Sequence, residues 1–137
     1  MREPLLETIL QSLRAYEPNQ LIAEPGEKTA AVAMIICGGE KPSLLMIKRA
    51  EHPKDPWSGH MAFPGGRIES SDATALSAAM REVREEIGLV LSPTDFITPL
   101  SPRYTLRRGH CNQVFVSPFV FFLNEQPSLS VNEEVAA

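Results

Sequence analysis

Two apolar segments of strand length lie on either side of an amphipathic helix, and this alternation constrains the fold more than any other feature. Residues 29–37 form the longest apolar run, and residues 113–123 are rich in Val and Phe, as expected of strands. Residues 73–87 carry apolar side chains at helical spacing, and Gly88 follows as a stop signal. The expected buried stripe comprises Leu76, Ala79, Met80, Val83 and Ile87. Strands mixed with well-separated helices predict an α/β or α+β domain.

A second helix is predicted near the N-terminus. Residues 4–16 carry Leu and Ile at helical spacing, Pro4 suits a first helical turn, and Pro18 stops the segment. We expect this helix to pack one face against the body of the domain as a structural element.

Shorter strands are expected between the two apolar segments. Residues 43–49 follow a Gly-Gly turn and are expected to form a hairpin with residues 29–37. Residues 50–59 are too rich in proline for regular structure. Residues 60–63 are a short strand candidate that ends in a tight loop at 64–66.

Three local features make further predictions about where the elements begin and end. Asp72 is expected to cap the helix that follows it. Pro118 is expected to interrupt its strand or to place it at a sheet edge, because proline cannot donate to a strand ladder. The tail at 128–137 shows no obvious closing element.

Composition bounds the class of protein. The chain has 137 residues, the size of one domain, with 43% hydrophobic and 22% charged residues. Thirteen Lys and Arg against 17 Asp and Glu give a net charge of -4, opposite to the bias of non-specific nucleic-acid or anionic-membrane binders.

No apolar run approaches the roughly 20 residues of a membrane helix. Cys37 and Cys111 form neither a C-x-x-C pair nor a disulfide framework, so we expect a cytoplasmic protein.

Three glutamates gather on one side of the predicted helix at 73–87. At about 100° per residue, Glu82, Glu85 and Glu86 share one side. Arg81 can pair with Glu85 one turn later and fix its rotamer. Carboxylates on a rigid helix suit Mg²⁺ or Mn²⁺, which bind oxygen ligands and substrate phosphates. A solvated acidic face is the alternative, and the Gly-Gly turn upstream favours a site because glycine lets a ligand approach the backbone.

The segment at 66–89 resembles the Nudix box, whose pattern is G-x5-E-x7-R-E-U-x-E-E-x-G-U with U aliphatic. The matching residues are Gly66, Arg81, Glu82, Val83, Glu85, Glu86, Gly88 and Leu89. The sequence departs from the pattern in two ways: Asp72 stands at the first acidic position, and eight residues rather than seven separate it from Arg81. The same expansion occurs in the coenzyme A diphosphatase branch, where F-P-G-G also precedes the box.

The resemblance implies an α/β/α sandwich around a mixed β-sheet, as a single domain over residues 1–137. It implies an enzyme that hydrolyses the pyrophosphate of a small-molecule nucleotide, with Mg²⁺ or Mn²⁺ as cofactor. Carried over by motif, Glu85 and Glu86 would bind metal, with the Gly66 carbonyl as a further ligand. Glu82 would bind metal or help to activate water, and Arg81 would orient Glu85.

The family also suggests a residue beyond the box. In much of the family, an acidic residue on a later loop serves as base or ligand, and Glu133 and Glu134 are the candidates. Glu134 is favoured because an E-V pair in such a loop recurs in the coenzyme A branch. Family members usually continue with a strand and a helix, which leaves open whether residues 1–137 are a truncated domain. Many relatives dimerise, so a monomer and a homodimer both remain open.

The residues before the box resemble the coenzyme A branch as well, which makes coenzyme A or an acyl-CoA the expected substrate. The expected substrate-binding residues are Arg49, Arg67, Gly65 and Gly66. Asp55 stands where that branch usually has Arg, whose two-pronged fork would suit a phosphate. The alternatives are ADP-ribose, a dinucleotide or an oxidised nucleoside triphosphate. A nucleotide-sensing domain without turnover is a further alternative, which the complete set of box carboxylates disfavours.

Overall fold

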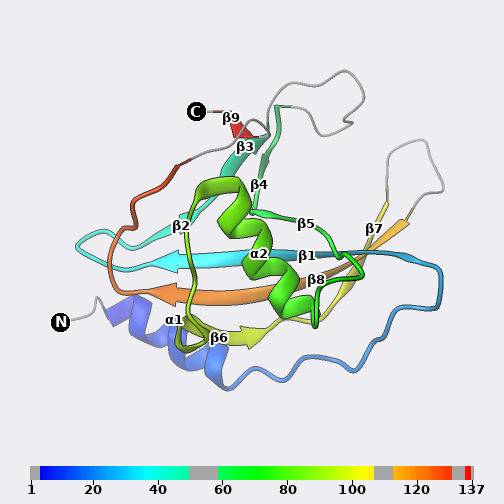
Figure 1. The fold of residues 1–137 in the computed structure, drawn as a ribbon. Helices are drawn as coiled ribbons and strands as arrows, with labels where there is room; N and C mark the ends of the chain where they lie inside the picture. The colour runs from blue at the N-terminus through cyan, green and yellow to red at the C-terminus, as the bar shows by residue number, and fades with distance from the viewer. Residues whose placement is uncertain (1–3, 50–58, 107–112, 131–134, 137) are drawn as a thin grey trace.

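A mixed β-sheet forms the centre of the molecule, and its two long strands lie side by side (Figure 1). The computed structural model describes residues 4–49, 59–106, 113–130 and 135–136. Strand β1 (Lys28–Cys37) runs parallel to β8 (Gln113–Leu123), and every residue of β1 has a partner in β8. These are the two apolar segments predicted from the sequence, so both strand predictions are confirmed.

Shorter antiparallel strands flank the long pair. On its other side β1 pairs with β2 (Ser43–Leu45) and β5 (Gly65–Arg67). On the side away from β1, β8 pairs with β6 (Phe96–Pro99) and β7 (Arg103–Leu106). A short 3-10 turn at Pro93–Asp95 leads into β6. The β1–β2 hairpin is therefore confirmed, whereas the tight loop expected at 64–66 is wrong because the two glycines belong to β5.

A second, small sheet has the order β4-β3-β9, from β4 (Met61–Ala62), β3 (Ile47–Arg49) and β9 (Val135–Ala136). The single strand predicted at 43–49 is thus divided at Met46, because the chain changes its partner from β1 to β4. The expectation that the tail closes no element is wrong, since β9 pairs with β3. The irregular segment predicted at 50–59 lies almost wholly outside the described residues.

Helix α2 (Ala75–Ile87) begins and ends at well-formed caps. The Thr74 hydroxyl accepts from the Ser77 backbone N–H at 3.0 Å, and the Ser77 hydroxyl accepts from the Thr74 N–H at 3.0 Å. Gly88 ends the helix with φ of 69°, a left-handed conformation that glycine tolerates, as predicted. The predicted cap at Asp72 is wrong, because Thr74 makes the reciprocal pair with Ser77 and the Asp72 carboxylate binds elsewhere.

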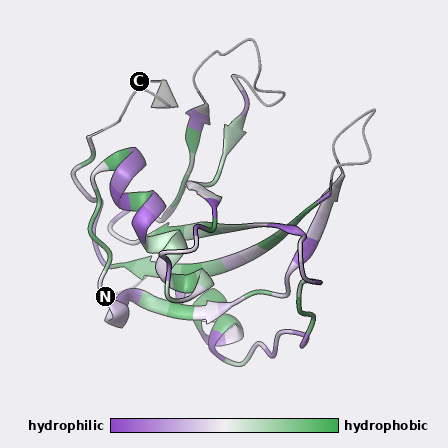
Figure 2. Cartoon of the chain, turned by 45° about the vertical axis from the view of Figure 1, so that its right-hand side comes forward, coloured by the Kyte–Doolittle hydropathy of each residue, from purple (hydrophilic) through white to green (hydrophobic). Residues whose placement is uncertain are grey.

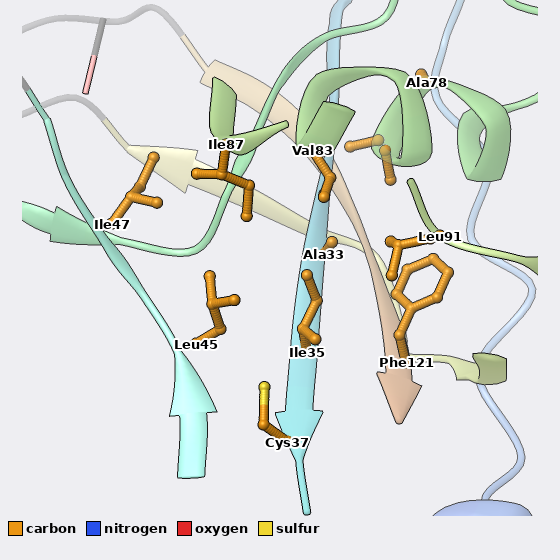
Figure 3. Packing of buried hydrophobic residues seen from close by; sticks show 12 residues of the cluster. Ala33, Ile35, Cys37, Leu45, Ile47, Ala78, Val83, Ile87, Leu91 and Phe121 are labelled. Carbon is orange, nitrogen blue, oxygen red and sulfur yellow. The ribbon is translucent and has the colours of Figure 1, made fainter. Parts of the chain in front are cut away.

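The main core lies between α2 and one face of the sheet (Figure 3). Alternate residues of β1 from Ala31 to Cys37 meet Val83 and Ile87 of α2, and Phe121 of β8 completes the floor. The predicted stripe of α2 is confirmed for Ala79, Val83 and Ile87, which are buried. Leu76 and Met80 are half-buried and pack against the same cluster, and the prediction missed the buried Ala78.

Helix α1 (Pro4–Arg14) packs on the opposite face, which confirms the predicted helix at 4–16 apart from its last two residues. Leu6 and Leu10 contact Phe122, the neighbour of Phe121 in β8, and successive strand residues point to opposite faces. Figure 2 shows hydrophobic residues concentrated along the strands between the helices. This arrangement is the α/β/α sandwich expected from the sequence. In the described part of the chain, neither helix is long and apolar enough to cross a membrane.

Pro118 lies within a central, uninterrupted strand, so the prediction of an edge or a break is wrong. The strand next to β8 changes at this point from β6 to β7. The Pro118 carbonyl accepts from the Leu100 N–H at 3.0 Å, on the same side. Proline is tolerated because the missing N–H faces the gap between two partner strands.

We expect Thr74→Ala to lower the free energy of unfolding by about 1 kcal/mol, because it removes the side-chain acceptor that caps α2. Thr8→Ala is the matched control, since that hydroxyl bonds back to the Pro4 carbonyl within α1 and Ala is the better helix former. Denaturant unfolding of both variants measures the difference. Equal losses in the two variants would contradict the capping role.

Candidate metal and phosphate site

The guanidinium of Arg81 is the centre of a hydrogen-bonded group on α2. Its Nε donates to Asp72 Oδ1 at 2.9 Å and its Nη2 donates to Asp72 Oδ2 at 3.0 Å, a two-pronged pair. The Asp72 side chain is 5% exposed and the Arg81 side chain 14%. The hydrogen bond from Arg81, with a further one from the Glu69 backbone, holds the pKa of Asp72 below its usual value.

The remaining nitrogen of Arg81 faces two of the predicted site carboxylates. Nη1 donates to Glu82 Oε1 and to Glu85 Oε2, each at 3.0 Å. The predicted pairing of Arg81 with Glu85 is therefore present, and Glu82 shares the same nitrogen. Nη2 also donates to the Arg67 carbonyl at 3.2 Å, which ties α2 to β5.

A short loop before α2 fixes the Asp72 carboxylate. The Glu69 N–H donates to Asp72 Oδ2 at 2.8 Å, and the Asp72 N–H donates to the Glu69 carbonyl at 3.0 Å. Sequence reasoning singled out Asp72 as a cap and as the first acidic box position, and it missed the bond to Arg81. The acidic position of the box was the only available signal for that contact.

The two glycines of β5 allow close packing between the strand, β1 and α2. A Cβ at Gly66 would lie 2.7 Å from the Glu82 carboxyl carbon, and one at Gly65 would collide with the Ala31 carbonyl oxygen. A side chain at Gly65 would therefore push the strand away from β1, and one at Gly66 would displace the Glu82 carboxylate. From the sequence we expected these glycines to let a ligand approach the backbone, and in the structure the groups that come close are Glu82 and β1.

The three glutamates differ in their access to water. Glu86 is 3% exposed and its Oε1 accepts from the Gly65 N–H at 3.1 Å. The Glu82 side chain is 13% exposed, and that of Glu85 is 50% exposed. Burial raises the pKa of Glu82, while a hydrogen bond with Glu86 and the charge of Arg81 act to lower it. Glu86 was expected on the same side of the helix as Glu82 and Glu85; it lies beside Glu82 and is the most deeply buried of the three, against β5.

These carboxylates supply the oxygen donors that a hard divalent cation prefers. Glu82 and Glu86 are one helical turn apart, both are withdrawn from water, and the space beside them lacks any side chain at Gly66. In the part of the chain that the structure describes, no three acidic, imidazole or thiol groups are already grouped around one point. Glu82 and Glu85 are turned toward Arg81, so a cation would have to share or displace that contact.

Of the other predicted site residues, the structure describes the side-chain direction of Arg67, which lies on the other face of β5. Gly66 faces α2, so the adjacent Arg67, paired with Ala30, leaves the sheet on the opposite face. The structure places the backbone of Arg49 in β3, where it pairs with Val135. Glu134 lies outside the described residues. The structure thus brings Arg81, its three glutamates and the glycine strand together, and it does not bring the Arg67 side chain to them.

Comparison with known proteins gives a consistent set of relatives. The sequence model of the NUDIX domain matches residues 27–137. An uncharacterized protein of Schizosaccharomyces pombe, C14C4.10c, is 34% identical over 146 residues, covering 92% of this chain and 44% of that protein. The uncharacterized Nudix hydrolase NudL of an Enterobacter species is 35% identical over 103 residues, covering 68% and 53%. The chain spans about half the length of these curated relatives.

A solved structure shares the fold. The NUDIX domain of Shewanella oneidensis NrtR, crystallised with ADP ribose, superposes with a TM-score of 0.65 at 17% identity, covering 92% of this chain and 77% of that one. The family match extends over most of the residues described above, including β5, α2 and the carboxylates on it. The chain therefore belongs to the Nudix family.

Proposed function

We propose that this chain is the catalytic domain of a divalent-metal-dependent pyrophosphohydrolase that cleaves a nucleoside diphosphate derivative. The observation that carries the proposal is the pair of inward carboxylates, Glu82 and Glu86, held against a glycine strand. Carboxylates withdrawn from water and placed one turn apart repel each other, and a bound cation relieves that repulsion. A purely solvated acidic face would leave both of them exposed.

The proposed ligands of Mg²⁺ or Mn²⁺ are the carboxylates of Glu82, Glu85 and Glu86, with the Gly66 carbonyl as a further donor. When bound, the cation supplies positive charge that offsets the charge of the pyrophosphate oxygens. Arg81 sets the directions of Glu82 and Glu85 through its two bonds from Nη1. The Gly65 N–H sets the direction of the Glu86 carboxylate through its bond to Oε1.

In the proposed reaction, a water oxygen bonds to phosphorus, the bridging P–O bond breaks, and the water proton passes to a carboxylate. Glu82 is the first candidate for the acceptor, because its carboxylate lies beside Gly66 and its side chain is only 13% exposed. Glu134 is the second candidate for this role, on the family resemblance alone. No Ser or Cys nucleophile is required, since the reaction depends on positioning and charge.

For the substrate we propose coenzyme A or an acyl-CoA. The support is the resemblance of residues 44–49 and 59–66 to the coenzyme A branch and the expanded spacing between Asp72 and Arg81. ADP-ribose is the second candidate, because the NrtR domain that shares this fold is crystallised with ADP ribose. Arg49 remains the proposed phosphate contact, and Arg67 is the weaker candidate because its side chain leaves the other face of the sheet.

Product analysis distinguishes the substrates. With Mg²⁺ or Mn²⁺ present, we expect coenzyme A to yield 3′,5′-ADP and 4′-phosphopantetheine, whereas ADP-ribose would yield AMP and ribose 5-phosphate. Chromatography of reactions with coenzyme A, an acyl-CoA, ADP-ribose, a dinucleotide and an oxidised nucleoside triphosphate identifies the products. Inertness toward all five with metal present would contradict the hydrolase assignment.

We expect Glu86→Gln to lower kcat by at least about 100-fold, or about 2.7 kcal/mol, because it removes one charge from the proposed metal ligands. The fold should persist, since the amide oxygen can still accept from the Gly65 N–H. Steady-state kinetics measures the loss.

Glu40→Gln is the matched control for Glu86→Gln, because it makes the same change on the exposed turn between β1 and β2. The kcat of Glu40→Gln should equal that of the unaltered chain. Near-normal turnover by Glu86→Gln would remove Glu86 from the ligand set.

Metal binding should also appear in thermal melting. A cation that binds only the folded chain stabilises it by about 2.7 kcal/mol at 100 times its dissociation constant. We expect Mn²⁺ to raise the Tm of the unaltered chain, and a chelator to reverse the rise. With chelator present, Glu86→Gln should melt slightly higher than the unaltered chain because carboxylate repulsion is lower. A Tm that Mn²⁺ leaves unchanged would argue against a metal site.

A further inference from the structure

We infer that Asp72 is a positioning residue that keeps Arg81 from competing with a divalent cation for Glu82 and Glu85. The inference rests on the proposed function, since it concerns the same carboxylates.

A guanidinium binds a carboxylate most strongly through two parallel N–H bonds. In this structure, that two-pronged arrangement is given to Asp72, through Nε and Nη2. Nη2 also bonds to the Arg67 carbonyl, so Nη1 alone meets the glutamates. Glu82 and Glu85 each receive a single bond from that nitrogen. Arg81 therefore directs the two glutamates without forming its strongest pair with either.

The partner that receives the two-pronged bond is itself fixed. The Asp72 side chain is 5% exposed, and its Oδ2 also accepts from the Glu69 N–H at 2.8 Å. The guanidinium is thus held on the side of the Glu69–Asp72 loop, with one edge turned to the helix. Glu69 itself adds little, because its carboxylate is 61% exposed and lies 3.8 Å from Nη1.

Asp72→Asn leaves one acceptor oxygen where Asp72 has two, so the two-pronged pair is lost and one N–H group of Arg81 is freed. The guanidinium could then turn and form a two-pronged pair with Glu82 or Glu85. It would act as a permanent internal cation at the position that the proposed metal must use. Loss of the Asp72 carboxylate would therefore weaken binding of the divalent cation, and it would do so only while Arg81 is present.

A double-mutant cycle with Mn²⁺ as the probe tests this dependence. Isothermal titration calorimetry of Mn²⁺ alone is made on the unaltered chain, Asp72→Asn, Arg81→Gln and the double variant. We expect Asp72→Asn to weaken Mn²⁺ binding by at least about 10-fold, the usual scale for a residue that orients metal ligands. In the Arg81→Gln background the same change should alter the dissociation constant by less than about 3-fold.

Two controls separate geometry from charge and from stability. Glu69→Gln removes one negative charge beside the same guanidinium and should change the Mn²⁺ dissociation constant by less than about 3-fold. Thr74→Ala weakens α2 and should lower the Tm without changing Mn²⁺ affinity. A melting curve with chelator verifies that Asp72→Asn is folded at the titration temperature.

The outcomes separate this inference from the proposed function. Mn²⁺ binding that Asp72→Asn leaves unchanged, or weakens equally with and without Arg81, would overturn the role of Asp72 and leave the metal site standing. Failure of the unaltered chain to bind Mn²⁺ would overturn the proposed function, and this inference with it.

Discussion

The parallel pairing of β1 with β8 is the interaction on which the other elements depend. It joins two segments that are far apart in the sequence and extends over the whole of β1. Consecutive residues of β8 serve different layers, because Phe121 belongs to the cluster under α2 and Phe122 to the cluster under α1. A shift of β8 by one residue would exchange the two faces, so the register of this one pair determines where both helices can pack.

The candidate site depends on that pair through β5 and α2, which both contact β1. The Asp72 loop fixes Arg81, and Arg81 in turn directs Glu82 and Glu85. Glu86 is fixed separately, by the backbone of β5. The carboxylates on α2 are therefore held from two directions, by a side chain on one side and by a strand on the other. This support explains why glutamates that repel one another lie close together on one short stretch of helix.

The sequence predicted those features that depend on local pattern. Both long strands, both helices and the Arg81–Glu85 contact follow from periodicity and spacing. The break at Met46 could not be predicted, because Leu45 and Ile47 are both buried and the apolar pattern continues across the change of partner. β6 and β7 were missed because nearby prolines obscure their strand pattern. The burial of Glu86 and the hydrogen bonds from Arg81 to Asp72 depend on where a loop and a strand lie in three dimensions.

Only one residue of β5, Gly66, faces α2, and a side chain there would displace the Glu82 carboxylate that fills the space. The strand that borders the carboxylates therefore offers no position at which a new side chain could select among ligands. Ligand preference therefore has to be set by residues outside β5, such as the proposed phosphate contact Arg49 in β3. Charge changes at such residues can remodel recognition while the buried scaffold stays constant.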